Sequence, residues 1–189
     1  MILGISGSPK QKSNTTSVLQ NLLSNCKSKG LESKLIELAN FNILPCKDCG
    51  ICKNKLDCPE KDNFLQIIPF LKKAKIIVIG SPVYFGTVTA QLKAFMDRSV
   101  MLRRNGFALA SKFGCGIAIG GSRNGGQELT LQTIHNWMLI HDMHIFADGQ
   151  PTSHFGGALV GRKSGDAVND QIGMQTVESL TNKIIQLTK

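Results

Sequence analysis

The most regular strand candidate in the chain is Ile76-Ile77-Val78-Ile79-Gly80, where four β-branched residues follow one another without a polar interruption. A continuous apolar run of this length is typical of a strand buried on both faces, as in the middle of a parallel sheet. Shorter apolar runs around it predict four further strands, at residues 2–6, 34–38, 114–119 and 144–147. Residues 76–80 are therefore expected to lie at the centre of a five-stranded sheet.

Helical patterns alternate with these strands. Apolar residues at helical spacing predict one helix that begins near Ser13 or Asn14 and ends at Gly30, and others at about 62–73, 89–104, 127–140 and 170–186. Pro69 is expected to kink or shorten the second helix, because it removes a backbone donor. Five βα units in series predict an α/β fold with a doubly wound parallel sheet between two layers of helices. Ligands of such sheets bind beyond the carboxyl ends of the strands.

The composition bounds the class of protein. The chain has 189 residues, of which 42 % are hydrophobic and 19 % charged, which predicts one globular domain over residues 1–189 and excludes a disordered protein. Gly80, Ser81 and Pro82 interrupt the longest apolar stretch, so a membrane span is excluded. The start MILGISGSPK lacks the pattern of a secretory signal, and we expect a cytoplasmic protein.

The charge is strongly basic, with 22 Lys and Arg against 13 Asp and Glu and a formal net charge of +9. Such a surplus favours acidic partners, among them nucleic acid, phosphorylated cofactors, acidic carrier proteins and anionic membranes. A single Tyr and a single Trp leave few rings on which bases could stack, which disfavours nucleic acid. Opposite charges balance within residues 46–62, so the surplus is expected elsewhere, for example at Lys93, Arg98, Arg103, Arg104 and Lys112.

The loop after the first strand predicts a phosphate site. It offers hydroxyls, an amide and two bases without any acid, at Ser8, Lys10, Lys12, Ser13, Asn14, Thr15 and Thr16. It leads into a helix N-terminus, whose unpaired N–H groups and dipole attract phosphate. Both the G-x-G-x-x-G of dinucleotide folds and the Gly-Lys-Ser/Thr of a P-loop are missing, so we predict a terminal phosphomonoester held without Mg²⁺. An ordinary polar loop with a good N-cap is the alternative.

Two further loops predict a site for a flat ring. The first contains Pro82, Val83, Tyr84, Phe85 and Gly86, which offer aromatic faces and unusual backbone angles. The second contains Gly121, Ser122, Arg123, Gly125 and Gly126, where backbone can approach a ligand closely and Arg123 can lie near an electron-rich ring. Core aromatics and a flexible turn are the alternatives. With the phosphate loop, these segments predict a mononucleotide with a flat ring.

Four of the six cysteines lie within thirteen residues, at Cys46, Cys49, Cys52 and Cys58, in a predicted loop over residues 41–61. Cytoplasmic thiols stay reduced, which disfavours a disulfide framework. The x2-x2-x5 spacing, with Pro59 after the last cysteine, is similar to bacterial ferredoxin runs and predicts one [4Fe–4S] centre with all four as ligands. A zinc knuckle and a redox loop without metal are the alternatives.

The remaining cysteines and the histidines carry weaker signals. Cys26 and Cys115 fall on apolar faces and are predicted to be core residues. The long connection over residues 148–169 is expected to be a functional cover or an arm onto another subunit. His154 lies within it, and we hypothesise that it covers the flat ring.

Several of these motifs resemble a known family. GSPKQKSNT, SPVYFG, QLKAFMDRS, GGSRNGGQE and IHNWM are similar to the NADPH-dependent FMN reductase superfamily. The cysteine run, LRRN, SHFGG and GMQTV resemble its iron–sulfur flavoprotein branch, which is found in methanogens and other anaerobes. The resemblance extends from Gly4 to about Leu187. It implies a flavodoxin-like five-stranded sheet in three layers, FMN, one [4Fe–4S] cluster, and a homodimer or homotetramer.

The resemblance also implies roles for individual residues. Ser8, Lys10, Ser13, Asn14 and Thr15 would hold the FMN phosphate, and residues 82–86 and 121–126 would bracket the isoalloxazine ring. Lys10 stands where relatives often carry Arg, which removes a bidentate clamp. Electrons would pass from an acidic ferredoxin-like carrier through the cluster to FMN, with O₂ or H₂O₂ among the proposed acceptors. No catalytic nucleophile or general base is expected.

Two other functions stay open at this point. One is an NAD(P)H-dependent FMN or quinone reductase whose cysteines are incidental. The other, motivated by the charge, is a non-catalytic module that binds FMN or nucleic acid. The favoured hypothesis is an electron carrier with neither a nucleic-acid nor a membrane partner.

Overall fold

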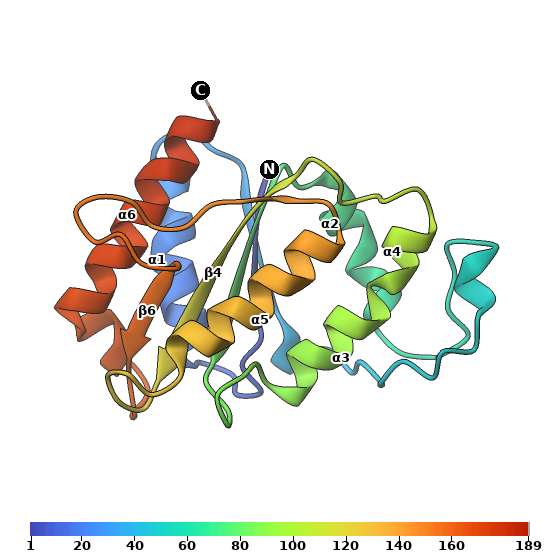
Figure 1. Cartoon of the computed structure of the whole chain (residues 1–189), viewed down its shortest axis with the longest axis horizontal. Coiled ribbons are helices and arrows are strands. Elements are labelled where there is room, and N and C mark those ends of the chain that lie inside the picture. The colour runs from blue at the N-terminus through green and yellow to red at the C-terminus, as the bar shows by residue number, and fades with distance from the viewer. Residues whose placement is uncertain (189) are drawn as a thin grey trace.

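A computed structural model describes residues 1–188 and has three layers, with a parallel sheet between two groups of helices (Figure 1). The strands are β1 (Ile2–Ser6), β2 (Ser33–Glu37), β3 (Ile76–Pro82), β4 (Phe113–Gly120), β5 (His144–Ile145) and β6 (Gly157–Val160). The helices are α1 (Asn14–Ser28), α2 (Ile68–Lys73), α3 (Ala90–Arg98), α4 (Val100–Arg104), α5 (Gln127–Ile140) and α6 (Gln171–Leu187). Within the described range, no helix is long and apolar enough to cross a membrane.

The sheet has the strand order β2-β1-β3-β4-β5, and every pairing is parallel. This confirms the predicted fold class, with β3 at the centre. The chain leaves β1 toward β2 and then crosses to β3 on the other side of β1. The strand order therefore reverses between β1 and β3, which is where ligands of doubly wound sheets bind.

The predicted count of five strands is corrected to six, although the sheet still has five positions. Phe113 and Gly114 of β4 pair with β5, whereas Ile117–Gly120 pair with β6. Because β3 occupies the other side of β4, β5 and β6 share one edge position and together form an interrupted edge strand. Residues 146–156 leave the sheet between them, so the predicted long connection contains a strand.

Each face of the sheet has its own core. Residues of α1 and α6, such as Leu19 and Leu180, pack with β-strand residues on one face. Residues of α2, α3, α4 and α5, such as Phe95 and Trp137, pack on the other. Cys26 and Cys115 are buried in the first core, which confirms their prediction as core residues.

Two predicted helices differ from the observed ones. The helix predicted over 62–73 is shortened, as expected from Pro69: α2 covers only Ile68–Lys73, and residues 64–66 form a separate 3-10 turn. Pro69 lies in the first turn of α2, where its missing N–H costs no hydrogen bond. The predicted helix over 89–104 breaks at Ser99 into α3 and α4. The Ser99 hydroxyl donates to the Met96 carbonyl at 2.6 Å, a side-chain bond that competes with regular helix.

Ser99 also organises a buried polar cluster. Its Oγ lies 2.8 Å from Trp137 Nε1, which donates to it, and 2.8 Å from His141 Nε2. Since the only hydroxyl proton goes to Met96, Ser99 must accept from both rings, and His141 carries its proton on Nε2. His141 Nδ1 is buried and has no hydrogen-bond partner among the described residues.

This arrangement predicts acid destabilisation. Burial lowers the pKa of His141 from 6.5 to about 4, and the positive charge of Arg103 adds to the effect. Between these two values the unfolded chain binds a proton that the folded chain does not, so stability present above pH 6.5 is lost as the pH falls. We expect His141 to account for about 2 kcal/mol of the loss between pH 7.5 and pH 5.

Urea unfolding of His141→Gln at both pH values checks this prediction. The variant should show a smaller difference between pH 7.5 and pH 5 than the wild type, although buried His135, whose pKa burial also lowers, retains part of the slope. His144→Gln is the matched control because His144 is exposed. Equal slopes in the wild type and His141→Gln would contradict the assignment.

Candidate flavin site and cysteine centre

The loops after β1, β3 and β4 meet at the carboxyl edge of the sheet, at the bottom of Figure 1. Ser13 is the N-cap of α1, where its Oγ accepts from the Thr16 N–H at 3.2 Å. Ser8 Oγ accepts from the Lys10 N–H at 3.2 Å, which closes a tight turn within the loop. This loop thus presents the positive end of α1 and its free N–H groups to the carboxyl edge.

A cavity of about 320 Å³ opens between these loops. It brings together nine of the residues predicted for the ligand, namely Ser8, Lys10, Ser13, Asn14, Thr15, Pro82, Val83, Tyr84 and Gly121. The other predicted residues lie outside its lining, namely Phe85, Gly86, Ser122, Arg123, Gly125 and Gly126. The cavity therefore unites the phosphate loop with the start of both ring segments.

Sequence reasoning missed a third side of this cavity, which residues after β6 supply. Gly161, Arg162 and Ser164 line it, Arg162 Nε donates to the Gly121 carbonyl at 2.7 Å, and Ser164 Oγ donates to the Lys12 carbonyl at 2.7 Å. The run Gly-Arg-Lys-Ser-Gly at 161–165 offers the same donors as the first loop and is the signal that could have found it.

The Asn14 side chain ties this segment to α1. Its Nδ2 donates to the Lys163 carbonyl at 2.8 Å, and its Oδ1 accepts from the Gly165 N–H at 2.8 Å. Asn14 therefore lines the cavity while its amide holds residues 163–165 in place. Residues 163–165 of the long connection thus lie against the start of α1 in the same chain.

The two ring segments touch each other at glycines. A Cβ on Gly126, whose φ is +100°, would lie 3.1 Å from the Gly86 Cα, so the close approach requires glycine at this position. Phe85 is fully exposed and Tyr84 is 42 % exposed at the rim. An apolar edge thus remains open to solvent beside the cavity.

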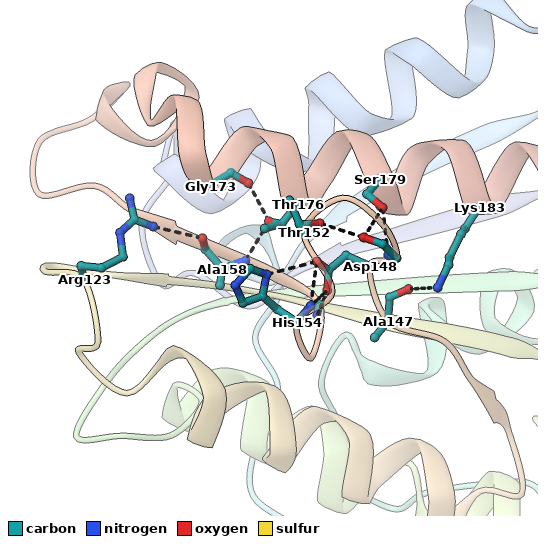
Figure 2. Close-up of polar contacts among 12 residues, drawn as sticks. Arg123, Ala147, Asp148, Thr152, His154, Ala158, Gly173, Thr176, Ser179 and Lys183 are labelled. Carbon is teal, nitrogen blue, oxygen red and sulfur yellow. Dashed lines mark hydrogen bonds and ion pairs between the residues drawn. The ribbon is translucent and has the colours of Figure 1, made fainter.

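Neither Arg123 nor His154 lines the cavity. Figure 2 shows Arg123 directed at Ala158 and His154 directed at Asp148. Arg123 Nη2 lies 2.6 Å from Asp170 Oδ1, and Nη1 donates to the Ala158 carbonyl at 3.4 Å. His154 Nδ1 lies 3.3 Å from the buried carboxylate of Asp148, which also accepts from the His154 N–H at 3.0 Å. These contacts fix the edge around β6, and the ring-covering hypothesis for His154 gains no support from them.

The cysteine loop projects beside α4 as the cyan segment at the right of Figure 1. A buried ion pair closes its base, with Arg98 Nη1 2.6 Å from Asp62 Oδ2. Asp62 also accepts from the Leu44 N–H at 2.9 Å, and Arg98 donates to the Leu44 carbonyl at 2.9 Å. Arg98 was counted among the residues that carry the basic surplus, but Asp62 neutralises it inside the fold, where its side chain is only 2 % exposed.

All four clustered cysteines line one small cavity, together with Arg98, Val100, Met101 and Arg104. Arg104 Nη1 donates to Cys52 Sγ at 3.2 Å, and Asn105 Nδ2 donates to the Cys52 carbonyl at 2.9 Å. The hydrogen bonds to Cys52 and Asp48 raise the pKa of Arg104 above its ordinary value. The end of α4 therefore holds a cysteine of the loop through both its sulfur and its backbone.

The donor set tests which group these residues fit. All four clustered cysteines line one cavity, although among residues 1–188 no three His, Cys, Asp or Glu side chains are grouped closely enough to hold a single ion. Four cysteine thiolates are the ligand set of a [4Fe–4S] cluster, so the residues present suit that group in their chemistry. A zinc ion also accepts four thiolates, and iron analysis distinguishes the two.

The sequence matches known proteins over its whole length. Residues 1–158 match the NADPH-dependent FMN reductase family. An iron–sulfur flavoprotein of Methanocaldococcus jannaschii is 46 % identical over 188 residues, which cover 100 % of this chain and 97 % of the relative. An iron–sulfur flavoprotein of Methanosarcina thermophila is 42 % identical over 183 residues, 97 % of this chain and 92 % of the relative. The chain belongs to the iron–sulfur flavoprotein branch of this family.

Solved structures support the fold of this iron–sulfur flavoprotein. The NADH:FMN oxidoreductase EMOB superposes with a TM-score of 0.69 at 19 % identity, covering 96 % of this chain and 86 % of the other. A flavodoxin from the domain Archaea superposes with a TM-score of 0.56 at 14 % identity, covering 94 % and 97 %. The flavodoxin-like architecture is thus confirmed, and the family identifies the chain as a flavin redox protein.

Proposed function

We propose that this iron–sulfur flavoprotein is an electron carrier that receives electrons from an acidic ferredoxin-like protein and delivers them to an acceptor such as O₂ or H₂O₂. Its two redox groups would be FMN in the cavity at the carboxyl edge and one [4Fe–4S] cluster on Cys46, Cys49, Cys52 and Cys58. The observation that carries the proposal is the single cavity around all four thiols, in a chain whose relatives are named iron–sulfur flavoproteins.

The cavity at the carboxyl edge suits FMN in its charge and shape. Ser8, Ser13, Thr15 and the N–H groups of α1 would bind the phosphate, while Lys10, Lys12 and Arg162 supply positive charge. Residues 82–86 and 121–126 would flank the ring. When bound, FMN accepts one or two electrons and the cluster accepts one. The chain itself needs only to bind and orient these groups, so we propose no catalytic residue.

The charge of the loaded protein favours an acidic partner. FMN phosphate adds about −1.5 to −2, and a cluster with four thiolates adds roughly −2. The net charge of +9 therefore stays positive, which suits docking of an acidic carrier in the cytoplasm. We also propose a homodimer or homotetramer, in which exposed apolar side chains such as Phe85 and Leu129 would contact a second copy of the chain.

Anaerobic purification tests the proposal. Iron, sulfide and FMN should be found at about four, four and one per chain, and the reduced protein should give the EPR signal of a [4Fe–4S] cluster. Reduced ferredoxin should then bleach the flavin. Protein that contains zinc in place of iron would contradict the proposal.

The family match supports one alternative, an NAD(P)H-dependent FMN or quinone reductase. The two functions differ in what they require of the cysteines. Rapid flavin reduction by NADPH that persists in Cys49→Ser would favour the reductase. Flavin reduction that needs ferredoxin and is lost in Cys49→Ser would favour the electron carrier.

A further inference from the structure

Two arginines line the cysteine cavity, and they differ in how well a carboxylate neutralises their charge. Arg98 is paired with Asp62 at 2.6 Å, and both side chains are buried, so the pair is neutral as a unit. Arg104 is paired with Asp48 at 3.1 Å, but the Asp48 side chain is 80 % exposed. Water screens a carboxylate so exposed, and a surface pair of this kind is weak. The charge of Arg104 is therefore left largely uncompensated at the cavity.

The Arg104 guanidinium is also directed at a sulfur atom. Nη1 donates to Cys52 Sγ at 3.2 Å, and the side chain is 25 % exposed, so three quarters of its surface is covered by the protein around it. Asn105 fixes the same cysteine by donating to its carbonyl and to the Met101 carbonyl. Arg104 is the last residue of α4 and Asn105 is its C-cap, so adjacent residues at the end of one helix hold both the sulfur and the carbonyl of Cys52.

We propose that Arg104 is a positioning residue that raises the reduction potential of the cluster by donating a charged hydrogen bond to the Cys52 sulfur. The inference rests on the proposed function, because it requires the cluster to be present. Reduction adds one electron from the ferredoxin-like donor to a group that already carries roughly −2, and no covalent bond forms or breaks. Part of the added charge falls on the ligand sulfurs, where a cationic donor stabilises it.

Potentiometric titration of the holoprotein, followed by EPR, tests the proposal. Arg104→Met should make reduction of the cluster at least about tenfold less favourable, which for one electron is a shift of about 59 mV to lower potential. Arg104→Gln keeps an N–H donor without the charge and should shift the potential in the same direction by less. Asp48→Asn removes the opposing carboxylate and should shift the potential upward.

Arg103→Met is the matched control for charge. Arg103 precedes Arg104 on the same helix, but its guanidinium lies over the Phe107 ring, 5.4 Å from the ring centroid. The variant removes one positive charge near the loop without removing a bond to sulfur. Its potential should stay close to that of the wild type.

The outcomes separate this proposal from the function on which it rests. A wild-type protein with iron and sulfide whose potential is unchanged in Arg104→Met overturns the role of Arg104 alone. Equal shifts in Arg103→Met and Arg104→Met overturn it as well, since distant charge would then suffice. Wild-type protein without iron overturns both proposals. If Arg104→Met fails to retain a cluster, Arg104→Gln takes its place: a larger downward shift than in Arg103→Met supports the proposal, and an equal or smaller shift contradicts it.

Discussion

Asp62→Ala should lower the free energy of unfolding by about 3–5 kcal/mol, because it leaves Arg98 as an unpaired buried charge. The carboxylate is 0 % exposed and the guanidinium 2 % exposed, so water cannot replace the lost partner. Asp62 also accepts from the Phe64 N–H at 3.0 Å and from the Leu44 N–H. Both ends of the cysteine loop would therefore lose their anchor, and we expect less iron per chain in the purified variant.

Urea unfolding of Asp62→Ala and Asp97→Ala at pH 7.5 measures the effect. Asp97 also pairs with a base, Lys93, at 2.6 Å, but its side chain is 48 % exposed, so its removal should cost less than about 1 kcal/mol. Similar losses in the two variants would show that the pair at the base of the loop is no stronger than a surface pair.

The same pair predicts a pH dependence. Burial would raise the pKa of Asp62, but hydrogen bonds from Arg98, Leu44 and Phe64 outweigh it and hold the pKa below its ordinary value. A lowered pKa in the folded state contributes stability that is present above about pH 4 and is lost as the pH falls further. The difference in stability between the wild type and Asp62→Ala should therefore shrink below about pH 4.

The parts of the fold that depend on local pattern could be predicted. Residues 76–80 form the core of the central strand β3, and α5 has the predicted bounds, because each is defined by its own apolar residues. Strand β6 could not be predicted in the same way. Its four residues Gly-Ala-Leu-Val become a strand because they pair with Ile117–Gly120 of β4, about forty residues earlier in the chain.

The same distinction between local pattern and distant contacts applies to the residues of the two sites. The first loop and the cysteine run carry their chemistry in consecutive residues, and the structure gathers each around a cavity. Arg162 reaches the cavity only because Asn14, on α1, holds the segment after β6. Arg98 can be buried because it pairs with Asp62. The two residues are 36 positions apart in the sequence, so residue type alone does not reveal the pairing.

Ser13→Asp should weaken FMN binding at least about 100-fold, because it places a carboxylate in the cavity beside the ligand phosphate. Juxtaposed like charges cost several kcal/mol, and each 1.4 kcal/mol is a factor of about ten in affinity. The helix should survive the change, since Asp serves as an N-cap as well as Ser and a negative charge there favours the helix dipole.

Quenching of flavin fluorescence by flavin-free protein measures this effect, with two comparisons that isolate its cause. Ser13→Asn has nearly the same shape as Ser13→Asp and also caps a helix, but it adds no charge, so its FMN affinity should stay within about tenfold of the wild type. Riboflavin lacks the phosphate and should bind the wild type and Ser13→Asp alike. If Ser13→Asp lost riboflavin and FMN to the same degree, the carboxylate would have damaged the ring site or the fold, and the phosphate would have to lie away from the N-terminus of α1.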